Sequence, residues 1–241
     1  VKNHPHYTSE LQGDDVGRGV GFGFWHNAGL ESGSTATINS DGSVSLIVGS
    51  VDIGGHRAAI SMHVAEVLEI DPEDVHPSIA STDAIGYTRM TVGSGTTVRT
   101  GWAAYNAAHE TKKQLIARVG KIWETSVENI AYEEGKFYHK ADPELWMMFK
   151  ELAGQLLSTG GGITVGATNT QPGGGGETFS THIVDEEVDP ETGKVTILRY
   201  TAIQDAGKAI HPSYVEGQMP VSYTHLRAHE TLRYLVCRLL R

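Results

Sequence analysis

The sequence predicts an α+β protein with mixed sheets and packed helices. Short stretches that alternate apolar and polar residues between glycine-rich turns indicate strands. Longer stretches in which apolar residues recur every three to four positions indicate helices. The two patterns follow one another irregularly over 241 residues, and no segment repeats another. This order is typical of a mixed fold rather than of a repeat array.

Each expected element is predicted from the pattern of residues within its own segment. Alternation between turn residues predicts strands at 17–25, 34–38, 43–50, 75–81, 130–132, 137–138, 178–188 and 194–203. One-sided apolar spacing predicts helices at 57–70, 96–119 and 143–157, with a short helical link at 121–128. The segment 158–176 is rich in Gly, Thr and Gln, which predicts a loop.

Composition and charge exclude several classes of partner. The formal net charge of -10 argues against a nucleic-acid backbone or an anionic membrane surface as partner. No apolar run approaches the roughly 18 residues that a membrane helix needs, and the first residues do not resemble a secretory signal. The one cysteine, Cys237, supports neither a disulfide framework nor a thiolate metal site. We therefore expect a cytoplasmic protein.

The chain is expected to divide into three parts. Residues 1–16 form the end of a preceding region or a linker, and residues 17–219 form the main domain, which we expect to be incomplete. Residues 220–241 carry four arginines against one glutamate, although the whole chain is acidic. A basic C-terminal helix is one interpretation. However, the stretch 220–231 can be encoded by a transposon-end sequencing adapter read in frame, so we interpret 220–241 as a non-native tail.

The first candidate for a binding site is the segment VDIGGHR, residues 51–57. It places Gly54 and Gly55 where a strand meets a helix. Such a junction lets backbone N–H groups approach an anion closely, and the helix dipole adds positive charge there. For this segment alone, a tight turn without any ligand is the favoured explanation of the two glycines.

The second candidate is the segment TVGSGTTVRTG, residues 91–101. The residues expected just before and at the start of the long helix are Gly93, Ser94, Gly95, Thr96 and Thr97. Their backbone donors and three hydroxyl groups would face one point. The segment lacks the lysine and the spacing of a nucleotide phosphate loop, and a simple N-cap cluster remains the alternative.

The third candidate is the segment 204–218, which follows a strand and ends at Gln218. The amide of Gln218 both donates and accepts, which suits the edge of a heterocyclic ligand or a core hydrogen bond equally. The histidines show no paired spacing typical of metal ligands, so we predict no metal held by protein side chains.

Five motifs then occur in one order: GRGVGFGFWHNAG, DGSVSLIVGSVDIGGHR, DAIGYTRMTVGSGTTVRTG, FSTHIVDEEVDPETGKV and QDAGKAIHPSYVEGQ. In this order they resemble the molybdopterin-binding large subunits of the xanthine dehydrogenase and aldehyde oxidase family, the molybdenum hydroxylases. The resemblance covers about residues 17–219. It implies that the fold is part of the molybdopterin-binding domain of such an enzyme.

The resemblance also implies a role for each candidate residue. It places Gly54 and Gly55 against the cofactor, gives the segment from Gly93 to Thr97 bonds to the cofactor phosphate, and gives Gln218 a contact with the pterin. The metal of such enzymes is held by the cofactor's own sulfur and oxygen atoms, so no protein ligand is implied. The family's catalytic glutamate lies in a segment that this sequence lacks, and no catalytic residue is assigned.

The activity that the resemblance implies belongs to an intact parent protein. It is hydroxylation of aldehydes or N-heterocycles with water as the oxygen source, carried out with molybdenum-molybdopterin in its mononucleotide or cytosine dinucleotide form. Electrons would leave through 2Fe-2S clusters to FAD on partner subunits or domains, which implies a hetero-oligomer. We expect the isolated chain to be inactive.

The sequence departs from the family in two further ways. It lacks the upstream FGG-type loop, and Gly55 is a glycine where many relatives carry glutamine or threonine. Two other functional classes remain open. A glycine-rich scaffold without redox activity would explain the turns but not the ordered motifs, and a nucleotide-binding enzyme is disfavoured by the loop spacing.

Overall fold

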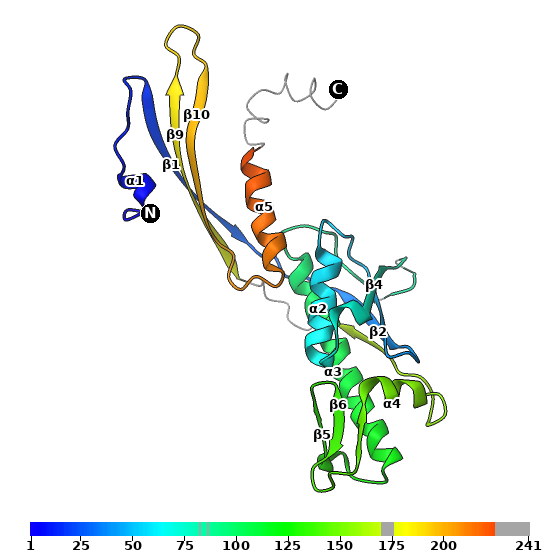
Figure 1. The fold of residues 1–241 in the computed structure, drawn as a ribbon. Coiled ribbons are helices and arrows are strands. Elements are labelled where there is room, and N and C mark those ends of the chain that lie inside the picture. The colour runs from blue at the N-terminus through cyan, green and yellow to red at the C-terminus, as the bar shows by residue number, and fades with distance from the viewer. Residues whose placement is uncertain (82, 86, 170–175, 225–241) are drawn as a thin grey trace. The chain divides into compact units, whose positions relative to one another are not determined.

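The computed structural model describes residues 1–81, 83–85, 87–169 and 176–224, and it confirms a mixed α+β fold (Figure 1). The chain divides into two compact units. The first is built from residues 1–26 together with the chain from residue 176 onward, and the second from residues 27–175. The boundaries that the sequence predicts at residues 16 and 219 stay predictions. Most of the predicted tail, residues 225–241, lies outside the described residues.

The first unit is a three-stranded antiparallel sheet in the order β1-β9-β10 (Figure 1). β1 (Val16–His26) pairs with β9 (Glu177–Val188) along its whole length, and β10 (Val195–Asp205) pairs on the other side of β9. A bulge interrupts the second pairing between Ile197 and Arg199. The three strands predicted here are therefore confirmed, and helix α5 (Pro212–Thr224) follows β10.

A buried polar cluster attaches the short helix α1 (Pro5–Thr8) to this sheet. The His6 ring is fully buried, with Nδ1 2.7 Å from Thr201 Oγ1 and Nε2 3.0 Å from Asp185 Oδ2. Arg18 donates from Nε to Asp185 Oδ1 at 2.6 Å and from Nη1 to two backbone carbonyls near α1. Arg18 thus links the chain before β1 to the sheet itself.

The second unit contains a four-stranded sheet in the order β4-β3-β2-β8. Its strands are β2 (Gly33–Ile38), β3 (Val44–Val48), β4 (Val75–Ile79) and β8 (Thr164–Thr168). β2 pairs antiparallel with β3 and β8, whereas β3 and β4 are parallel. The parallel pair requires a crossover connection, which helix α2 supplies between them.

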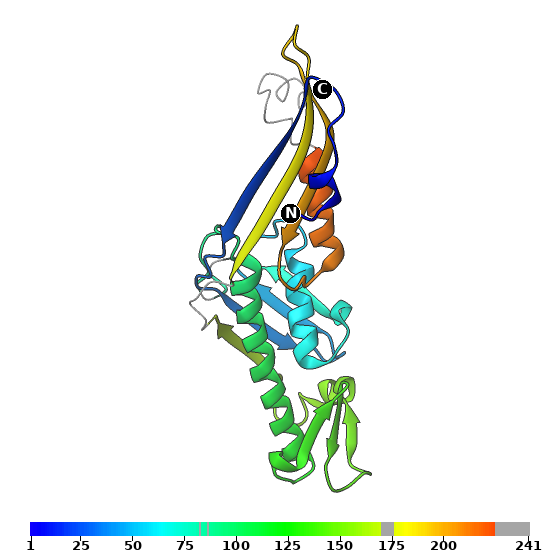
Figure 2. The same cartoon turned by 90° about the vertical axis from the view of Figure 1, so that its left-hand side faces the viewer.

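Helices α2 (His56–Leu68) and α3 (Thr96–Ile122) lie side by side on one face of this sheet (Figure 2). Four alanines on α3, Ala103, Ala104, Ala107 and Ala108, are fully buried, so the helix approaches its neighbours closely. Leu46, Ile60 and Val64 are also fully buried in the same apolar core. The helices predicted at 57–70 and 96–119 are confirmed, with small shifts of their ends.

A second, three-stranded sheet packs at the far end of α3 in the order β5-β6-β7. Its strands are β5 (Ile130–Glu133), β6 (Lys136–His139) and β7 (Trp146–Met148), and helix α4 (Phe149–Gln155) follows directly. Two single turns of 3-10 helix, η1 (Pro72–Asp74) and η2 (Val127–Asn129), precede β4 and β5. The strands predicted at 130–132 and 137–138 are therefore confirmed, and they form an antiparallel hairpin.

Three predictions from local pattern were wrong. The helical link expected at 121–128 is interrupted, because Glu124 adopts φ 52° and Thr125 N donates to Gly120 O, which ends α3. The helix expected at 143–157 starts only at Phe149, since the preceding residues pair with β6. The loop expected at 158–176 contains β8, which pairs along β2.

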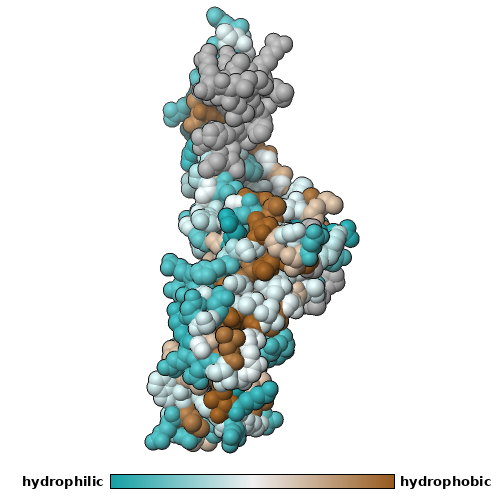
Figure 3. Space-filling model, turned by 90° about the vertical axis from the view of Figure 1, so that its right-hand side faces the viewer, coloured by the Kyte–Doolittle hydropathy of each residue, from teal (hydrophilic) through white to brown (hydrophobic). Residues whose placement is uncertain are grey.

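The molecular surface carries both apolar and hydrophilic side chains. On the face drawn in Figure 3, apolar side chains form separate patches among hydrophilic ones. β1 contributes exposed aromatic residues, with Phe22 76% and Phe24 68% accessible. Within the described ranges, no helix is both long and apolar enough to cross a membrane.

Candidate functional site

The candidate site in the second unit begins in the loop that precedes α3. Gly93 and Ser94 have φ values of 64° and 53°, and Gly95, the N-cap of α3, has φ -90° and ψ -10°. Successive residues of left-handed and right-handed conformation turn their N–H groups toward one side of the chain. This loop therefore has the backbone geometry of an anion-binding concavity.

The carbonyl groups of the same loop are engaged by the protein. Four of them accept hydrogen bonds from within the unit. The pairs are Met90 O with Arg99 Nη2 at 2.6 Å, Val92 O with Gly95 N at 3.4 Å, Gly93 O with Ala28 N at 3.0 Å, and Ser94 O with Asn27 Nδ2 at 3.2 Å. These bonds hold the loop carbonyls against the protein.

Most backbone N–H groups of this stretch remain available as hydrogen-bond donors. α3 makes its first backbone bond from Arg99 N to Gly95 O at 2.9 Å, and no side chain caps its N-terminus. Among the described residues, none accepts a hydrogen bond from the N–H groups of Gly93, Ser94, Thr96, Thr97 and Val98. Free donors at a helix N-terminus attract anions, and the helix dipole adds to that attraction.

Close packing also requires glycine at two of these positions. A Cβ on Gly93 would lie 2.6 Å from Ala28 Cβ, and a Cβ on Gly95 would lie 2.8 Å from Gly29 O. Packing therefore explains the two glycines without a ligand. It does not explain the row of unsatisfied N–H groups.

The turn at Gly54 and Gly55 has a different chemistry. Asp52 Oδ1 accepts hydrogen bonds from Gly54 N at 3.0 Å and from His56 N at 3.1 Å, and Arg57 Nε donates to Asp52 Oδ2 at 2.8 Å. The bond from Arg57 is the main reason why the pKa of Asp52 is lowered. A carboxylate thus already lies at the N-terminus of α2 and occupies donors that an external anion would need.

The space above Gly54 in the same turn is open. Gly54 has φ 108° and Gly55 has φ 80°, both in the region that favours glycine. A Cβ on Gly54 would meet no atom within 4 Å. The turn therefore offers exposed backbone against which a flat, neutral group can lie closely.

A buried hydroxyl cluster connects the strand that leads to this turn with the start of α3. Thr100 Oγ1 lies 2.6 Å from Ser50 Oγ and 3.0 Å from Ser32 Oγ, and Ser32 Oγ lies 3.3 Å from Thr88 Oγ1. Ser32, Ser50 and Thr100 are each almost completely buried. Sequence reasoning did not single out these hydroxyl groups, since their pairing depends on residues far apart in the chain.

Arg99 and His56 were also missed by sequence reasoning. Arg99 is fully buried, and its Nε and Nη1 atoms have no hydrogen-bond partner within the described part of the chain. His56 is 3% exposed, and neither of its ring nitrogens has such a partner. Burial is the main cause that lowers the pKa of His56, and the positive charge of Arg99 acts in the same direction. The one sequence signal for Arg99 was its position four residues after Gly95, close to the start of α3.

The predicted candidates therefore fall into two groups. Gly54, Gly55 and the segment 93–97 all belong to the second unit. Gln218 belongs to the first unit, where it is an exposed residue of α5. The prediction that Gln218 completes the same site stays a prediction.

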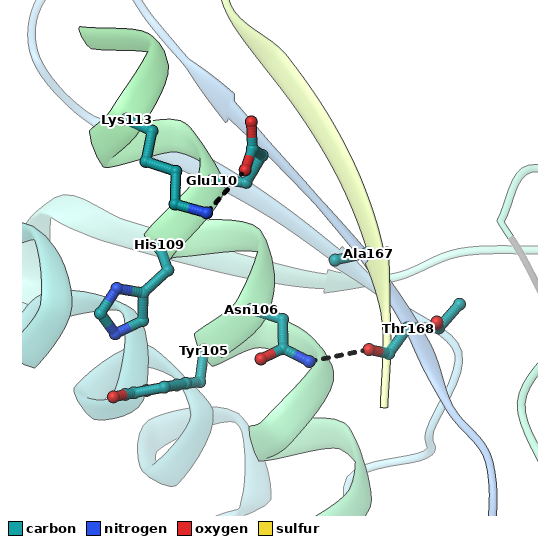
Figure 4. A pocket seen from close by; sticks show the side chains of 7 residues that line it. All are labelled: Tyr105, Asn106, His109, Glu110, Lys113, Ala167 and Thr168. Atoms are coloured by element: carbon teal, nitrogen blue, oxygen red, sulfur yellow. Dashed lines mark hydrogen bonds and ion pairs between the residues drawn. The ribbon is translucent and has the colours of Figure 1, made fainter. Parts of the chain in front are cut away.

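A separate pocket lies along the outer side of α3, between the helix and β8 (Figure 4). It has a volume of about 460 Å³ and contains none of the predicted site residues. Two of its polar side chains are paired within the protein: Lys113 Nζ lies 3.3 Å from Glu110 Oε2, and Asn106 Nδ2 donates to Thr168 O at 2.9 Å.

Comparison with solved structures identifies chains of the same fold. The reconstituted CO dehydrogenase of Oligotropha carboxidovorans matches with a TM-score of 0.74 at 23% sequence identity, over 84% of this chain and 27% of that one. At this level of identity the likeness shows the fold alone.

Sequence comparisons agree with the structural one. The large subunit of nicotine 6-hydroxylase from Paenarthrobacter nicotinovorans is 28% identical over 77% of this chain and 24% of its own length. The putative xanthine dehydrogenase molybdenum-binding subunit of Escherichia coli is 29% identical over 86% of this chain and 29% of its own length. The chain thus spans about a quarter of the length of the curated relatives it matches.

The sequence profile of one family covers nearly all of the described chain, from the loop after α1 to the last turns of α5. The matched residues are 9–222, and the profile is that of the molybdopterin cofactor-binding domain. This match includes the loop before α3, the Gly54-Gly55 turn and Gln218. The chain therefore belongs to the molybdopterin cofactor-binding domain family.

Proposed function

We propose that this chain forms one wall of the cofactor site in the large subunit of a molybdenum hydroxylase, and that the loop 93–97 binds the cofactor phosphate. The observation that carries the proposal is the row of unsatisfied N–H groups in and after this loop. A phosphate ester offers several strong acceptor oxygens and negative charge, which matches those donors and the helix dipole.

The residues present fit such a group in a specific orientation. The Asp52 carboxylate repels a phosphate from the N-terminus of α2, whereas no carboxylate of the described residues is hydrogen-bonded to the loop before α3. The open backbone at Gly54 suits the flat and uncharged pterin instead. We therefore assign the phosphate to the α3 loop, the pterin to the Gly54-Gly55 turn, and an amide contact with the pterin to Gln218.

The reaction class belongs to the whole protein of which this chain would be a part. Such a cofactor supplies the redox chemistry, while protein residues bind and orient it. We propose hydroxylation of an aldehyde or an N-heterocycle with water as the oxygen source. The names of two relatives, a nicotine hydroxylase subunit and a xanthine dehydrogenase subunit, support the heterocycle class.

Partners and cellular location follow from the same reasoning. Several relatives are named as subunits of larger assemblies, which supports a hetero-oligomer with separate FAD and 2Fe-2S subunits or domains. We propose a cytoplasmic location and the cytosine dinucleotide form of the cofactor. The dinucleotide would extend the phosphate into a diphosphate, for which the five free N–H groups provide enough donors.

A matched pair of variants at Ser94 tests the phosphate assignment in the complete large subunit. Asn and Asp both tolerate the left-handed conformation that Ser94 adopts, and they differ chiefly in charge. We expect Ser94→Asp to lose most of the bound molybdenum and pterin, and Ser94→Asn to retain them. Metal analysis by mass spectrometry and pterin fluorescence after denaturation provide the readouts.

Two results would contradict the proposal. Equal cofactor content in both Ser94 variants would show that the loop does not hold the phosphate. A folded large subunit without any molybdenum or pterin, isolated from cells that make the cofactor, would instead support the scaffold alternative.

A further inference from the structure

We propose that Arg99 is an anion ligand, whose guanidinium group binds a phosphate-class oxyanion at the N-terminus of α3 through Nε and Nη1. This inference rests on the proposed function and adds a residue that neither the resemblance nor the family match assigns. It gives the site a full positive charge in addition to its backbone dipoles.

The burial of Arg99 is the first argument. The residue is fully buried, although a guanidinium group stays protonated in proteins. Of its three nitrogens, only Nη2 has partners: it donates to Met90 O at 2.6 Å and lies 3.5 Å from Thr96 Oγ1. Nε and Nη1 have none among the described residues. A buried charge with unmet hydrogen bonds is strongly unfavourable unless a partner is supplied.

No acidic side chain in the described chain provides that partner. Glu31 is the carboxylate that acts electrostatically on Arg99, and it opposes the lowering of the Arg99 pKa by burial. However, Glu31 Oε2 is bonded to Arg89 Nε at 3.0 Å, and its side chain is 59% exposed. Arg99 therefore has no counter-ion of its own, although it lies in an acidic chain.

The direction of the side chain is the second argument. Long side chains in a helix point back toward its N-terminus. The two partners of Nη2, Met90 and Thr96, lie before α3 and in its first turn, so the guanidinium group reaches the region where the N–H groups are unsatisfied. A single oxyanion there would satisfy both the backbone donors and the buried charge.

A second arginine on the same helix shows what a purely structural role looks like. Arg118 donates from Nη1 to Leu156 O at 2.8 Å, to Gly161 O at 2.9 Å and to Thr159 Oγ1 at 3.2 Å. Its hydrogen bonds are thus made within the protein. Arg118 is therefore the matched control for Arg99.

The first experiment measures the thermal stability of the full chain in phosphate and in chloride at equal ionic strength. We expect inorganic phosphate to raise the melting temperature of the unaltered chain and of Arg118→Met. Arg99→Met should respond to phosphate about tenfold more weakly, since a charged hydrogen-bonded contact is lost. In chloride, Arg99→Met should be as stable as the unaltered chain or more so, because an unpaired buried charge is removed.

The second experiment measures pterin and molybdenum in the complete large subunit with Arg99→Met and Arg99→Lys. We expect Arg99→Met to lose most of the pterin and Arg99→Lys to lose less, since lysine keeps the charge but not the planar donor pair. This arm separates a cofactor-borne phosphate from free phosphate, because only the former brings pterin with it.

In the stability experiment, the proposal would be overturned by either of two results. One is an Arg99→Met chain that responds to phosphate as strongly as the unaltered chain. The other is an Arg99→Met chain that is destabilised to the same extent in phosphate and in chloride, as a structural arginine would be. If Arg99→Met keeps its pterin while Ser94→Asp loses it, this inference fails and the proposed function stands.

Discussion

The hydroxyl oxygens of Ser50 and Thr100 lie 2.6 Å apart in a fully enclosed position beneath the two candidate turns. Ser50 leads into the Gly54-Gly55 turn, and Thr100 lies in the first turns of α3, one residue after Arg99. One hydrogen bond thus fixes the spacing of two segments that are 50 residues apart in the sequence. Both hydroxyl groups are buried, so this contact connects the two candidate turns from inside the protein.

Thr100→Val should therefore destabilise the second unit. Valine has nearly the same shape as threonine but leaves the hydroxyl groups of Ser32 and Ser50 without their shared partner. Unmet buried polar groups cost about 1–3 kcal/mol. Urea denaturation measures this loss. Thr37→Val is the control, because Thr37 bonds to Thr164 in an exposed pair and should change stability by no more than about 0.5 kcal/mol.

Gly93→Ala should destabilise the loop before α3. The new Cβ would lie 2.6 Å from Ala28 Cβ, at a backbone φ of 64° that disfavours side chains. Strain of this kind costs about 1–3 kcal/mol. Gly162→Ala provides the comparison, since its Cβ would meet nothing within 4 Å and its φ is not positive. Equal melting temperatures for the two variants would contradict the described packing.

Asp52→Ala should weaken the start of α2 by about 0.5–2 kcal/mol, because Gly54 N and His56 N lose their acceptor. Arg57→Ala removes only the ion pair to the same carboxylate. The Arg57 side chain is 54% exposed, so this loss should stay below about 1 kcal/mol. Circular dichroism during denaturation gives both values, and a larger effect of Arg57→Ala would refute the capping role of Asp52.

Stability should fall in acid because of Asp185 in the first unit. The hydrogen bond from Arg18 is the main cause that lowers the pKa of this carboxyl group, and His6 acts in the same direction. A lowered pKa means that the stabilisation is present above the pKa of the unfolded state, which is about 4. It is lost as the pH falls through the lower pKa of the folded state.

Asp185→Asn should consequently flatten the acid limb of the stability curve. Denaturation measured between about pH 2 and 6 would show the difference, because the amide cannot titrate. Asp14→Asn, at an exposed position before β1, serves as the control and should leave the acid limb unchanged. If Asp185→Asn keeps the full acid dependence, other carboxylates are responsible for it.

Local sequence pattern predicted the elements whose own residues carry the signal. The alternation on either side of residues 39–42 predicted the strands β2 and β3, and the apolar spacing within 57–70 predicted α2. The free N–H groups of the loop 93–97 were predicted in the same way, because a glycine-rich segment before a helix leaves such donors. These properties need no distant partner.

Other elements could not be predicted locally, because a distant strand determines their conformation. Trp146–Met148 has helical apolar spacing, yet it becomes β7 since the edge of β6 provides backbone partners. Thr164–Thr168 contains a glycine that weakens its strand signal, yet it becomes β8 along the free edge of β2. Long-range hydrogen bonding outweighs the weak local preference at both positions.

By itself the sequence determined the α+β class, the order of the main strands and helices, and the glycine-rich backbone of the candidate site. Only the tertiary structure decided which polar groups are buried without a partner. Arg99 and His56 look like ordinary polar residues in the sequence, and Asp52 looks like an ordinary turn residue. Burial and pairing arise from segments brought together by folding, so the unpaired nitrogens of Arg99 and the N–H groups already bonded to Asp52 emerge only in three dimensions.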